Sequence, residues 1–444
     1  MEQKTLLKNK KNQGNGGETM AKRDDSVKKK VPELRFKGFT DDWEQRRFGS
    51  TVTIERGGSP RPISKYITNS EDGLNWIKIG DAPEEGNYIT HTAEKILPEG
   101  LSKTREVHPG DLILSNSMSF GKPYIMEIDG CIHDGWLLIR NDKNKFELKF
   151  LCVLLGTDNM INQYKAMAAG STVNNLNKQL VGGTTVSFPS SPEQQQIGAF
   201  FDHLDTLISL HQRKLDLLKE QKKGFLQKMF PKNGEKVPEL RFAGFADDWE
   251  QRKFEDLLDS KDGVRRGPFG GALKKEFFVE NSEYVVYEQQ NAIYDNYHTR
   301  YKITKEKFDE LSKFKLNPGD FIMSGAGTIG RISRVPDGVK LGVFNQALIR
   351  FRINPEITDS EYFIQFVRAD FMQKNLTGAN PGSAITNLVP MSEVKKWEIK
   401  VPHLEEQEKI GSFFAQLDNT ISLHQRKLDL LKEQKKGFLQ KMFV

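Results

Sequence analysis

One sequence occurs twice in this chain, and the repeat constrains the fold more than any other feature. The segment VPELRFKGFTDDWEQRRF at 31–48 returns as VPELRFAGFADDWEQRKF at 237–254, with 15 of 18 positions identical. The segment ISLHQRKLDLLKEQKKGFLQKMF runs from 208 to 230 and recurs unchanged at 421–443. Chance does not produce this identity, so the chain consists of two half-chains in tandem.

The regions between the repeated ends, 50–190 and 256–402, have diverged almost completely and share only a few landmarks. The sequence HPGDLILSNSMSFGK at 108–122 parallels NPGDFIMSGAGTIGR at 317–331. Such landmarks indicate one fold that was copied and then changed. Identical ends predict one structural or docking task performed twice, whereas different middles predict two different targets. Neutral drift of the middles after the duplication is the competing explanation.

Residues from 191 onward have the pattern of a long helix. The N-cap candidates are Ser190 and Ser191, ahead of Pro192 in the first turn. Seven-residue spacing then places side chains at the a and d positions of a coiled coil. One series holds Phe201, Ile208, Leu215 and Met229 with Lys222 in the gap, and the other holds Ile197, Leu204, His211, Leu218 and Phe225. The second copy repeats both series, so we expect the two helices to pair with each other, antiparallel.

A helix of about 34 residues spans about 50 Å, so such a pair would hold two domains rigidly at a fixed distance from each other. We expect this geometry to suit a linear ligand with two separated half-sites, such as a DNA duplex. His211 and His424 fall on the helix seam without a second histidine or cysteine nearby, which predicts packing or register rather than catalysis or metal binding. The basic stretch KEQKKGFLQKM has three open interpretations: contact with DNA phosphate, contact with a partner subunit, or solvation.

Each middle region alternates short β-type runs with glycine-rich and proline-rich turns and has helical stretches near its end. This pattern predicts the α+β class, with two pseudo-symmetric domains joined by two long antiparallel coiled-coil helices. The predicted parts are a disordered basic tail at 1–30, a first domain at 31–190, a helix at 191–230, a linker at 231–236, a second domain at 237–402 and a helix at 403–444.

Basic residues gather in the first loop of each divergent region. They are Arg56, Arg61 and Lys65 in ERGGSPRPISKY, and Arg265, Arg266, Lys274 and Lys275 in VRRGPFGGALKKE. Arginine and lysine in such loops bind phosphates or guanine edges. We therefore take both loops as candidate nucleic-acid contacts; for any one residue, surface solvation is the alternative.

The loop after each Pro-Gly-Asp turn has a matched position but unmatched residues, as specificity requires. Its candidate contacts are Asn116, Ser119 and Lys122 in the first domain and Ser324, Thr328 and Arg331 in the second. Further candidates for pairing with adenine are Gln289, Gln290 and Asn291, because an amide offers both the donor and the acceptor that the major-groove edge of adenine requires. Two glycine-rich loops add Ser171, Asn174 and Asn380, for which turn geometry is the alternative explanation.

Composition limits the location and the partners of the chain. No apolar run reaches the roughly 18 residues of a membrane span, and the N-terminus lacks the apolar stretch of an export signal, so we expect a cytoplasmic protein. Met20 is an alternative start. The formal charge of +6 is compatible with a polyanionic partner but does not require one. Cys131 and Cys152 lack CxxC spacing, which predicts buried free thiols rather than a metal site.

Motifs for catalysis are missing from the sequence. The segment GAGTIGR at 325–331 has arginine where a phosphate-binding loop needs lysine, so it predicts no NTPase. The PDGVK turn at 336–340 lacks the second carboxylate of a nuclease metal site. The Asn/Asp-Pro-Pro-aromatic tetrapeptide expected of an amino-methyltransferase is also absent. We therefore expect a non-catalytic chain that binds no cofactor or metal directly.

The repeated opening VPELRFxGFxxxWExxxF, the two helices with LHQRKLDxLKxxKKGxLQKMF and the PGD-containing domains resemble the specificity subunits of type I restriction-modification enzymes, over nearly the whole chain after residue 30. The resemblance implies two target-recognition domains that each read one half of an interrupted, asymmetric DNA site. It also implies two methyltransferase and two nuclease-translocase partners, which would use S-adenosylmethionine, ATP and magnesium. A coiled-coil scaffold whose domains bind proteins is the alternative.

Overall fold

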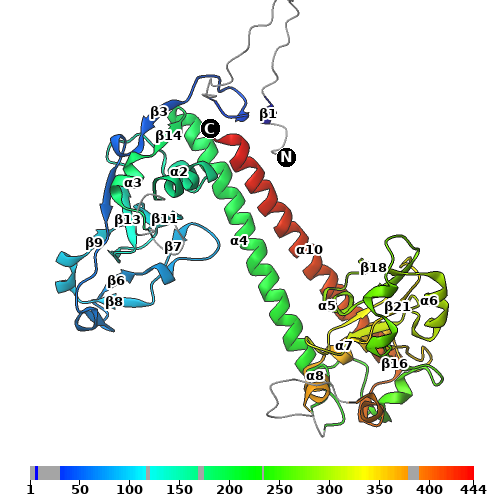
Figure 1. Ribbon diagram of the computed structural model, residues 1–444. Helices are drawn as coiled ribbons and strands as arrows, with labels where there is room; N and C mark the ends of the chain where they lie inside the picture. Colours follow the sequence, from blue (N-terminus) through cyan, green and yellow to red (C-terminus); the bar gives the residue numbers. More distant parts are fainter. Residues whose placement is uncertain (1–5, 9–30, 117–120, 169–174, 233–234, 379–389) are drawn as a thin grey trace, which may run out of the picture. The chain divides into compact units, whose positions relative to one another are not determined.

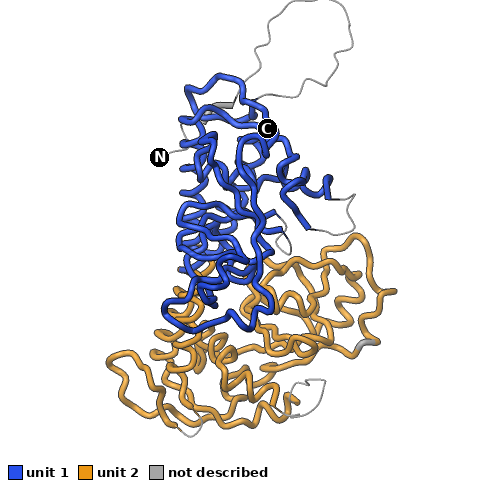
Figure 2. Tube along the Cα trace, turned by 90° about the vertical axis from the view of Figure 1, so that its left-hand side faces the viewer, with its two compact units in different colours: residues 1–213, 424–444 blue, residues 214–423 orange. Residues whose placement is uncertain are grey.

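The computed structural model describes residues 6–8, 31–116, 121–168, 175–232, 235–378 and 390–444. The chain divides into two compact units: unit 1 consists of 1–213 with 424–444, and unit 2 consists of 214–423 (Figure 2). The two long helices, α4 (Ser191–Lys228) and α10 (Leu404–Met442), are shown in Figure 1. Each unit therefore contains one divergent region and a part of both long helices, whereas the sequence predicted the helices as separate parts.

Unit 1 is built on two five-stranded sheets. The first has the order β4 (Thr53–Arg56), β13 (Trp136–Arg140), β10 (Leu112–Ser115), β11 (Pro123–Met126) and β7 (Tyr88–Ile89). The second has the order β5 (Ile67–Thr68), β8 (Glu94–Ile96), β6 (Leu74–Ile77), β12 (Gly130–Ile132) and β9 (Arg105–Val107). The helices α1 (Leu148–Leu155), α2 (Asp158–Ala168) and α3 (Lys178–Gly183) follow, and β14 (Thr185–Phe188) then pairs with β3 (Glu44–Arg47).

Unit 2 repeats this plan with smaller sheets. One sheet has the order β16 (Val264–Arg266), β22 (Leu348–Phe351), β19 (Phe321–Ser324) and β20 (Ile332–Arg334). The other has the order β18 (Tyr301–Ile303), β17 (Tyr284–Tyr287) and β21 (Gly342–Phe344). The helices are α5 (Gln289–Tyr294), α6 (Lys305–Glu310), α7 (Ser360–Arg368), α8 (Asp370–Thr377) and α9 (Met391–Val394), and β23 (Glu398–Val401) pairs with β15 (Glu250–Lys253).

The first sheets of the two units have the same topology. The antiparallel order β4-β13-β10-β11 in unit 1 corresponds to β16-β22-β19-β20 in unit 2. Each second sheet also contains one parallel pair, β6 with β12 and β17 with β21. The prediction of one α+β fold copied twice is confirmed.

The shared Pro-Gly-Asp sequence forms the turn that leads into the central strand β10 or β19. Gly110 and Gly319 have φ of 92° and 85°, a region that favours glycine. The Asp111 carboxylate accepts a hydrogen bond from the His108 amide at 3.0 Å, and Asp320 accepts one from the Asn317 amide at 2.8 Å. These local bonds explain why this turn survived when the surrounding sequence diverged.

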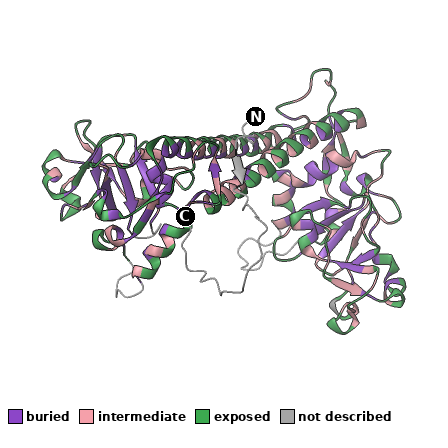
Figure 3. Cartoon of the chain, turned by 90° about the horizontal axis from the view of Figure 1, so that it is seen from above, coloured by how far each residue is buried: buried purple, intermediate pink, exposed green. Residues whose placement is uncertain are grey.

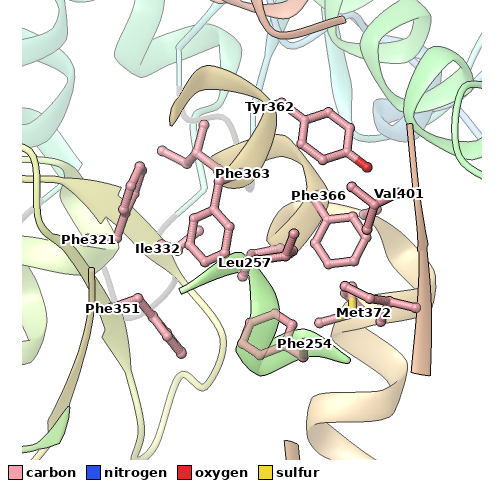
Figure 4. Close-up of a cluster of buried hydrophobic side chains, with 14 of the residues drawn as sticks. Phe254, Leu257, Phe321, Ile332, Phe351, Tyr362, Phe363, Phe366, Met372 and Val401 are labelled. Atoms are coloured by element: carbon pink, nitrogen blue, oxygen red, sulfur yellow. The ribbon is translucent and has the colours of Figure 1, made fainter. Parts of the chain in front are cut away.

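Parts of the long helices belong to the hydrophobic core of each unit. In unit 2, the core contains Phe254, Phe351, Phe363 and Phe366 (Figure 4). The same cluster includes Met229 and Phe230 directly after α4 and Ile410 and Phe414 in the first part of α10. Burying one such side chain contributes about 1.5–3 kcal/mol. Buried residues also fill the sheets of both units (Figure 3).

The repeated opening segment anchors the helices in both units. In unit 1, the Arg35 guanidinium donates to both carboxylate oxygens of Glu193 at 2.8 and 2.6 Å. In unit 2, Arg241 forms the same bidentate pair with Glu406 at 2.7 and 2.8 Å. The opening tryptophans contact the helix ends, because Trp43 packs edge-on against Phe443 and Trp249 packs edge-on against Phe230. These contacts explain why the opening segment and the helices are the conserved parts of the repeat within this chain.

The long helices pair antiparallel within each unit, as the heptad pattern predicts. In unit 1, Phe200 of α4 contacts Phe438 of α10, Asp205 pairs with Lys435, and His211 contacts His424. In unit 2, Lys222 of α4 donates to Asp418 of α10 at 2.6 Å, and Phe225 contacts Phe413. Residues later in the sequence of α4 contact residues earlier in the sequence of α10, so the two helices run antiparallel. The helices have 38 and 39 residues and lie within the ranges predicted for them, 191–230 and 403–444.

The N-terminal tail departs from expectation at one place. Residues Leu6–Lys8 form strand β1, which pairs antiparallel with β2 (Leu34–Phe36). The prediction of a disordered tail at 1–30 is wrong for these three residues, because an edge strand such as β2 offers unpaired backbone groups to any nearby segment.

Candidate nucleic-acid interface

The loop after β4 carries the first group of candidate contacts in unit 1. Gly57 starts the loop in such close contact with β-sheet neighbours that a Cβ atom would lie 2.1 Å from the His133 carbonyl oxygen. Arg61 then projects with 84% of its side chain exposed, and its nearest carboxylate, Asp134, is 3.7 Å away. Arg56 and Lys65 are also exposed. This cationic loop is therefore available to a polyanion.

In unit 2, the loop after β16 also starts at a closely packed glycine. A Cβ atom on Gly267 would lie 1.9 Å from the Asn345 carbonyl oxygen, so only glycine fits here. Arg266 is exposed, as are Lys274 and Lys275 further along. Arg265 is held differently, since its guanidinium pairs with Asp262 at 2.7 Å. The two neighbouring arginines therefore have different environments.

The loop between β19 and β20 is held closed by a buried serine. Ser324 accepts a hydrogen bond from the Arg331 amide at 3.0 Å and donates to the Thr328 carbonyl. Ser115 plays the same part in unit 1, accepting from the Lys122 amide at 3.0 Å. The serine of this landmark is a scaffold residue, and the side chains of Thr328 and Arg331 remain exposed.

Three expected base contacts are buried, and the prediction is wrong for them. Asn116 is 2% exposed and its amide donates to the Asp134 carbonyl at 2.8 Å. Asn291 is 1% exposed and bonds the carbonyls of Asn296 and His298. Ser324 is fully buried. Their polar groups satisfy the backbone of neighbouring loops, so none is available to a base edge.

Lys122 folds back on its own domain. Its amine donates to the Pro83 and Glu84 carbonyls at 3.2 and 2.8 Å and lies over the Tyr124 ring. Burial lowers the pKa of this amine more than nearby charges raise it. Lys122 therefore supports the loop rather than extending toward a ligand.

The remaining candidates differ in exposure. Gln290 is exposed and Gln289 is partly exposed at the start of α5. Gln290 donates to Glu288 at 3.3 Å, and Gln289 lies beside Gly327. The candidates Ser119, Ser171, Asn174 and Asn380 lie outside the described residues.

In unit 2, a cavity of about 620 Å³ is lined by residues of the β19–β20 loop and by basic residues of α4. Thr328 and Arg331 line this cavity together with Lys219 and Lys223 of α4. Asp370 is also part of the wall. A cleft with several cationic side chains suits a backbone phosphate, which favours DNA contact among the three interpretations of the basic helical stretch.

Metal-ligand clusters, long apolar helices and the two cysteines bear on other kinds of site in the described residues. The described residues contain no group of three or more histidine, cysteine or acidic side chains able to hold a metal ion. Within these same ranges, no helix is long and apolar enough to cross a membrane. Cys131 and Cys152 are buried free thiols, and burial raises the pKa of Cys131 to about 11 and that of Cys152 to about 12. The prediction for both cysteines is confirmed.

Comparison with known proteins agrees with this geometry. The family model of the type I restriction modification DNA specificity domain matches residues 40–220 and 246–433. A protein of Methanocaldococcus jannaschii assigned as the MjaX specificity subunit of a type I restriction enzyme is 22% identical over 418 residues, 90% of this chain and 92% of that protein. The EcoBI specificity subunit of Escherichia coli is 22% identical over 413 residues, 88% of this chain and 83% of that protein.

A solved structure has the same fold. The S subunit of a type I restriction-modification system from M. genitalium aligns with a TM-score of 0.60 and 12% sequence identity, covering 93% of this chain and 99% of that chain. At this identity the likeness concerns the fold alone.

Proposed function

The chain belongs to the family of type I restriction-modification DNA specificity proteins, and we propose that each unit reads one half of a bipartite, asymmetric DNA site. One observation carries this proposal: the same sheet topology occurs twice, with different side chains on the matched loops. Around Gly57 the first unit presents Arg56, Arg61 and Lys65, whereas around Gly267 the second unit presents a different sequence. A shared scaffold with unshared loops reads two different half-sites, because base contacts rather than phosphate contacts carry sequence information.

Within each unit, we propose a division of contacts between phosphate and bases. Lys219 and Lys223 on α4 suit backbone phosphate, since lysine acts as a point charge. Arg61, Arg266 and Arg331 are exposed guanidinium groups on loops, which can form bidentate bonds with guanine. The phosphate contacts would set the register of the DNA, and the loop contacts would select the sequence.

The chain would leave the chemistry to other subunits. We propose that it binds no cofactor directly and that its partners use S-adenosylmethionine, ATP and magnesium. This chain would then determine which DNA site the assembled enzyme recognises, in the cytoplasm.

Two copies of the methyltransferase would dock on the repeated helices. Large apolar side chains are exposed at matched positions: Leu210 and Leu217 on α4 are 55% and 49% exposed, and Leu423 and Leu430 on α10 are 60% and 47% exposed. Leucines seven residues apart form the stripe that another helix covers. Because the two stripes have identical sequences, each suits one copy of the same partner. We propose that two nuclease-translocase subunits join this assembly.

The direct test is to co-express the full chain with a type I methyltransferase subunit and to map methylated adenines across a genome by single-molecule sequencing. A gapped, two-part motif that appears only in the presence of this chain is the expected result. A complex that forms without any motif would contradict DNA recognition and favour a protein-binding scaffold. Methyl transfer by the purified chain alone would contradict the non-catalytic role.

A further inference from the structure

Phe269 is the most exposed large apolar side chain in the described parts of the chain, with 94% of its surface accessible. It lies in the loop after β16, in the sequence RRGPFGG. A phenyl ring gains free energy when it leaves water, so a ring held in solvent by the fold is a candidate for contact with a ligand.

The backbone of this loop holds Phe269 outward. Gly267 approaches the Asn345 carbonyl too closely for any other residue, and Pro268 next to it is buried with its φ fixed by the ring. The Phe269 carbonyl accepts a hydrogen bond from the Ala272 amide at 2.8 Å, which closes the loop. The exposed position of the ring is therefore built into the fold.

Phe269 borders an open groove of about 970 Å³. Leu311 and Phe314 contribute apolar atoms to its lining, together with Ala326 from the β19–β20 loop and Gln346 before β22. The groove thus brings together the tip of the β16 loop and the loop that the sequence singled out for specificity.

The charges around the groove identify the class of ligand. Arg266 and Lys313 line it together with one acid, Glu310. The exposed residues Lys274 and Lys275 follow in the same loop. An aromatic side chain with several cations around it suits nucleic acid, because the cations attract phosphate and the ring contacts bases.

The matched loop in unit 1 has a different sequence after its glycine. Gly57 makes the same close approach as Gly267, but the residue two positions on is Ser59 instead of phenylalanine, and Arg61, four positions after Gly57, is 84% exposed. The loops that follow these two glycines therefore present a guanidinium in one unit and a phenyl ring in the other, at different distances from the shared glycine. Such a difference between two loops on one scaffold is expected of residues that determine which DNA sequence is read.

We propose that Phe269 inserts between adjacent base pairs of the half-site read by unit 2, and that this insertion contributes to sequence specificity. The inference rests on the DNA-reading function proposed above. Apolar side chains that enter the base stack open and kink one base step, and the cost depends on the sequence at that step. Flexible pyrimidine–purine steps are the expected sites.

The test uses the full chain in complex with a methyltransferase subunit. The duplex carries the mapped motif, with 2-aminopurine placed in turn at each step of the unit 2 half-site. That half-site is the one that persists when the divergent region of unit 1 is exchanged. Wild-type complex should raise the fluorescence at one step, and Phe269→Ala should abolish this rise and weaken binding about tenfold or more. Phe269→Trp should retain both effects.

Two controls distinguish a failure of the proposed function from a failure of the inference about Phe269. Leu341→Ala removes another apolar side chain of unit 2, 50% exposed and not part of the groove lining, and should bind as wild type. On a duplex with a scrambled unit 2 half-site, wild type and Phe269→Ala should bind equally. If wild type yields no motif, the proposed function fails and the inference with it. If wild type reads a motif and Phe269→Ala matches it in binding and fluorescence, or loses affinity equally on both duplexes, only the inference is overturned.

Discussion

His211 and His424 contact each other with their Nδ1 atoms 3.1 Å apart, and each is the counterpart of the other in the repeat. Contacts on both sides of this pair also occur twice. Lys435 binds Asp205 in unit 1 as Lys222 binds Asp418 in unit 2. The histidine pair therefore lies at the centre of the repeat: on one side of it a lysine of α10 binds an aspartate of α4, and on the other side a lysine of α4 binds an aspartate of α10.

The histidine contact predicts that acid weakens the helix pair. Burial lowers the pKa of His211 below its ordinary value of 6.5, and the neighbouring His424 and Lys427 lower it further. As the pH falls through 6.5, the unfolded chain takes up a proton before the folded chain does. The free energy of unfolding therefore decreases on acidification.

A comparison of two histidine variants measures this effect. Between about pH 7.5 and about pH 5, the Tm of wild type should fall more than that of His211→Gln, which cannot take up the proton. His203→Gln changes an exposed histidine of the same helix and should keep the wild-type pH dependence. Equal pH dependence of wild type and His211→Gln would contradict this prediction.

The buried ion pair of the opening segment should be important for stability. Arg35 is 6% exposed and Glu193 1%. Arg35→Met leaves the Glu193 carboxylate buried without its partner, and we expect a loss of about 3–5 kcal/mol in the free energy of unfolding of unit 1, measured by urea denaturation. The double variant Arg35→Met with Glu193→Leu should recover part of this loss. A loss below about 1 kcal/mol would mean that the pair behaves like a surface salt bridge.

Much of the architecture could be predicted from the sequence because it depends on periodicity. The seven-residue spacing of Phe201, Ile208 and Leu215 placed the seam of the helix, and all three are buried. The two copies of one segment indicated antiparallel pairing. Sequence could not show that Trp43 contacts Phe443, since this contact joins the first repeat to the last helix across the whole chain.

The candidate contacts were predicted less well because loop position does not fix the direction of a side chain. Asn116 and Asn291 have the right chemistry for bases, but both satisfy backbone groups inside the domain. Arg265 and Arg266 are neighbours in a strand, so their side chains point to opposite faces. Phe269 was missed entirely, although an aromatic residue among glycines beside two arginines was a usable signal.

The two helix ends should stabilise different units. Phe443, directly after α10, packs on Trp43, Phe150 and Phe201 in unit 1, whereas Phe230, two residues after α4, packs in the core of unit 2. Replacing either phenylalanine with alanine should cost about 3–5 kcal/mol. Hydrogen exchange should accelerate in α1 for Phe443→Ala and in α7 for Phe230→Ala. Faster exchange in both helices for either variant would contradict the assignment.

Exchange of one divergent region should change one half-site only. The strand pair β3–β14 and the bond from the Phe48 amide to the Thr184 carbonyl, at 2.9 Å, enclose the first region. A donor segment that replaces 51–183 therefore leaves this closure intact. The expected methylation motif keeps one half, read by unit 2, and gains the half-site of the donor.

The matched control replaces the second region inside its own closure. There β15 pairs with β23, and the Phe254 amide donates to the Trp397 carbonyl at 2.9 Å, so 257–394 is the exchangeable segment. This exchange should alter the half-site that the first exchange preserved. The gap between the half-sites should stay constant in both chimeras, because neither exchange touches α4 or α10. Loss of both halves from a single exchange, in a chimera that still binds the methyltransferase, would show that the units do not read DNA independently.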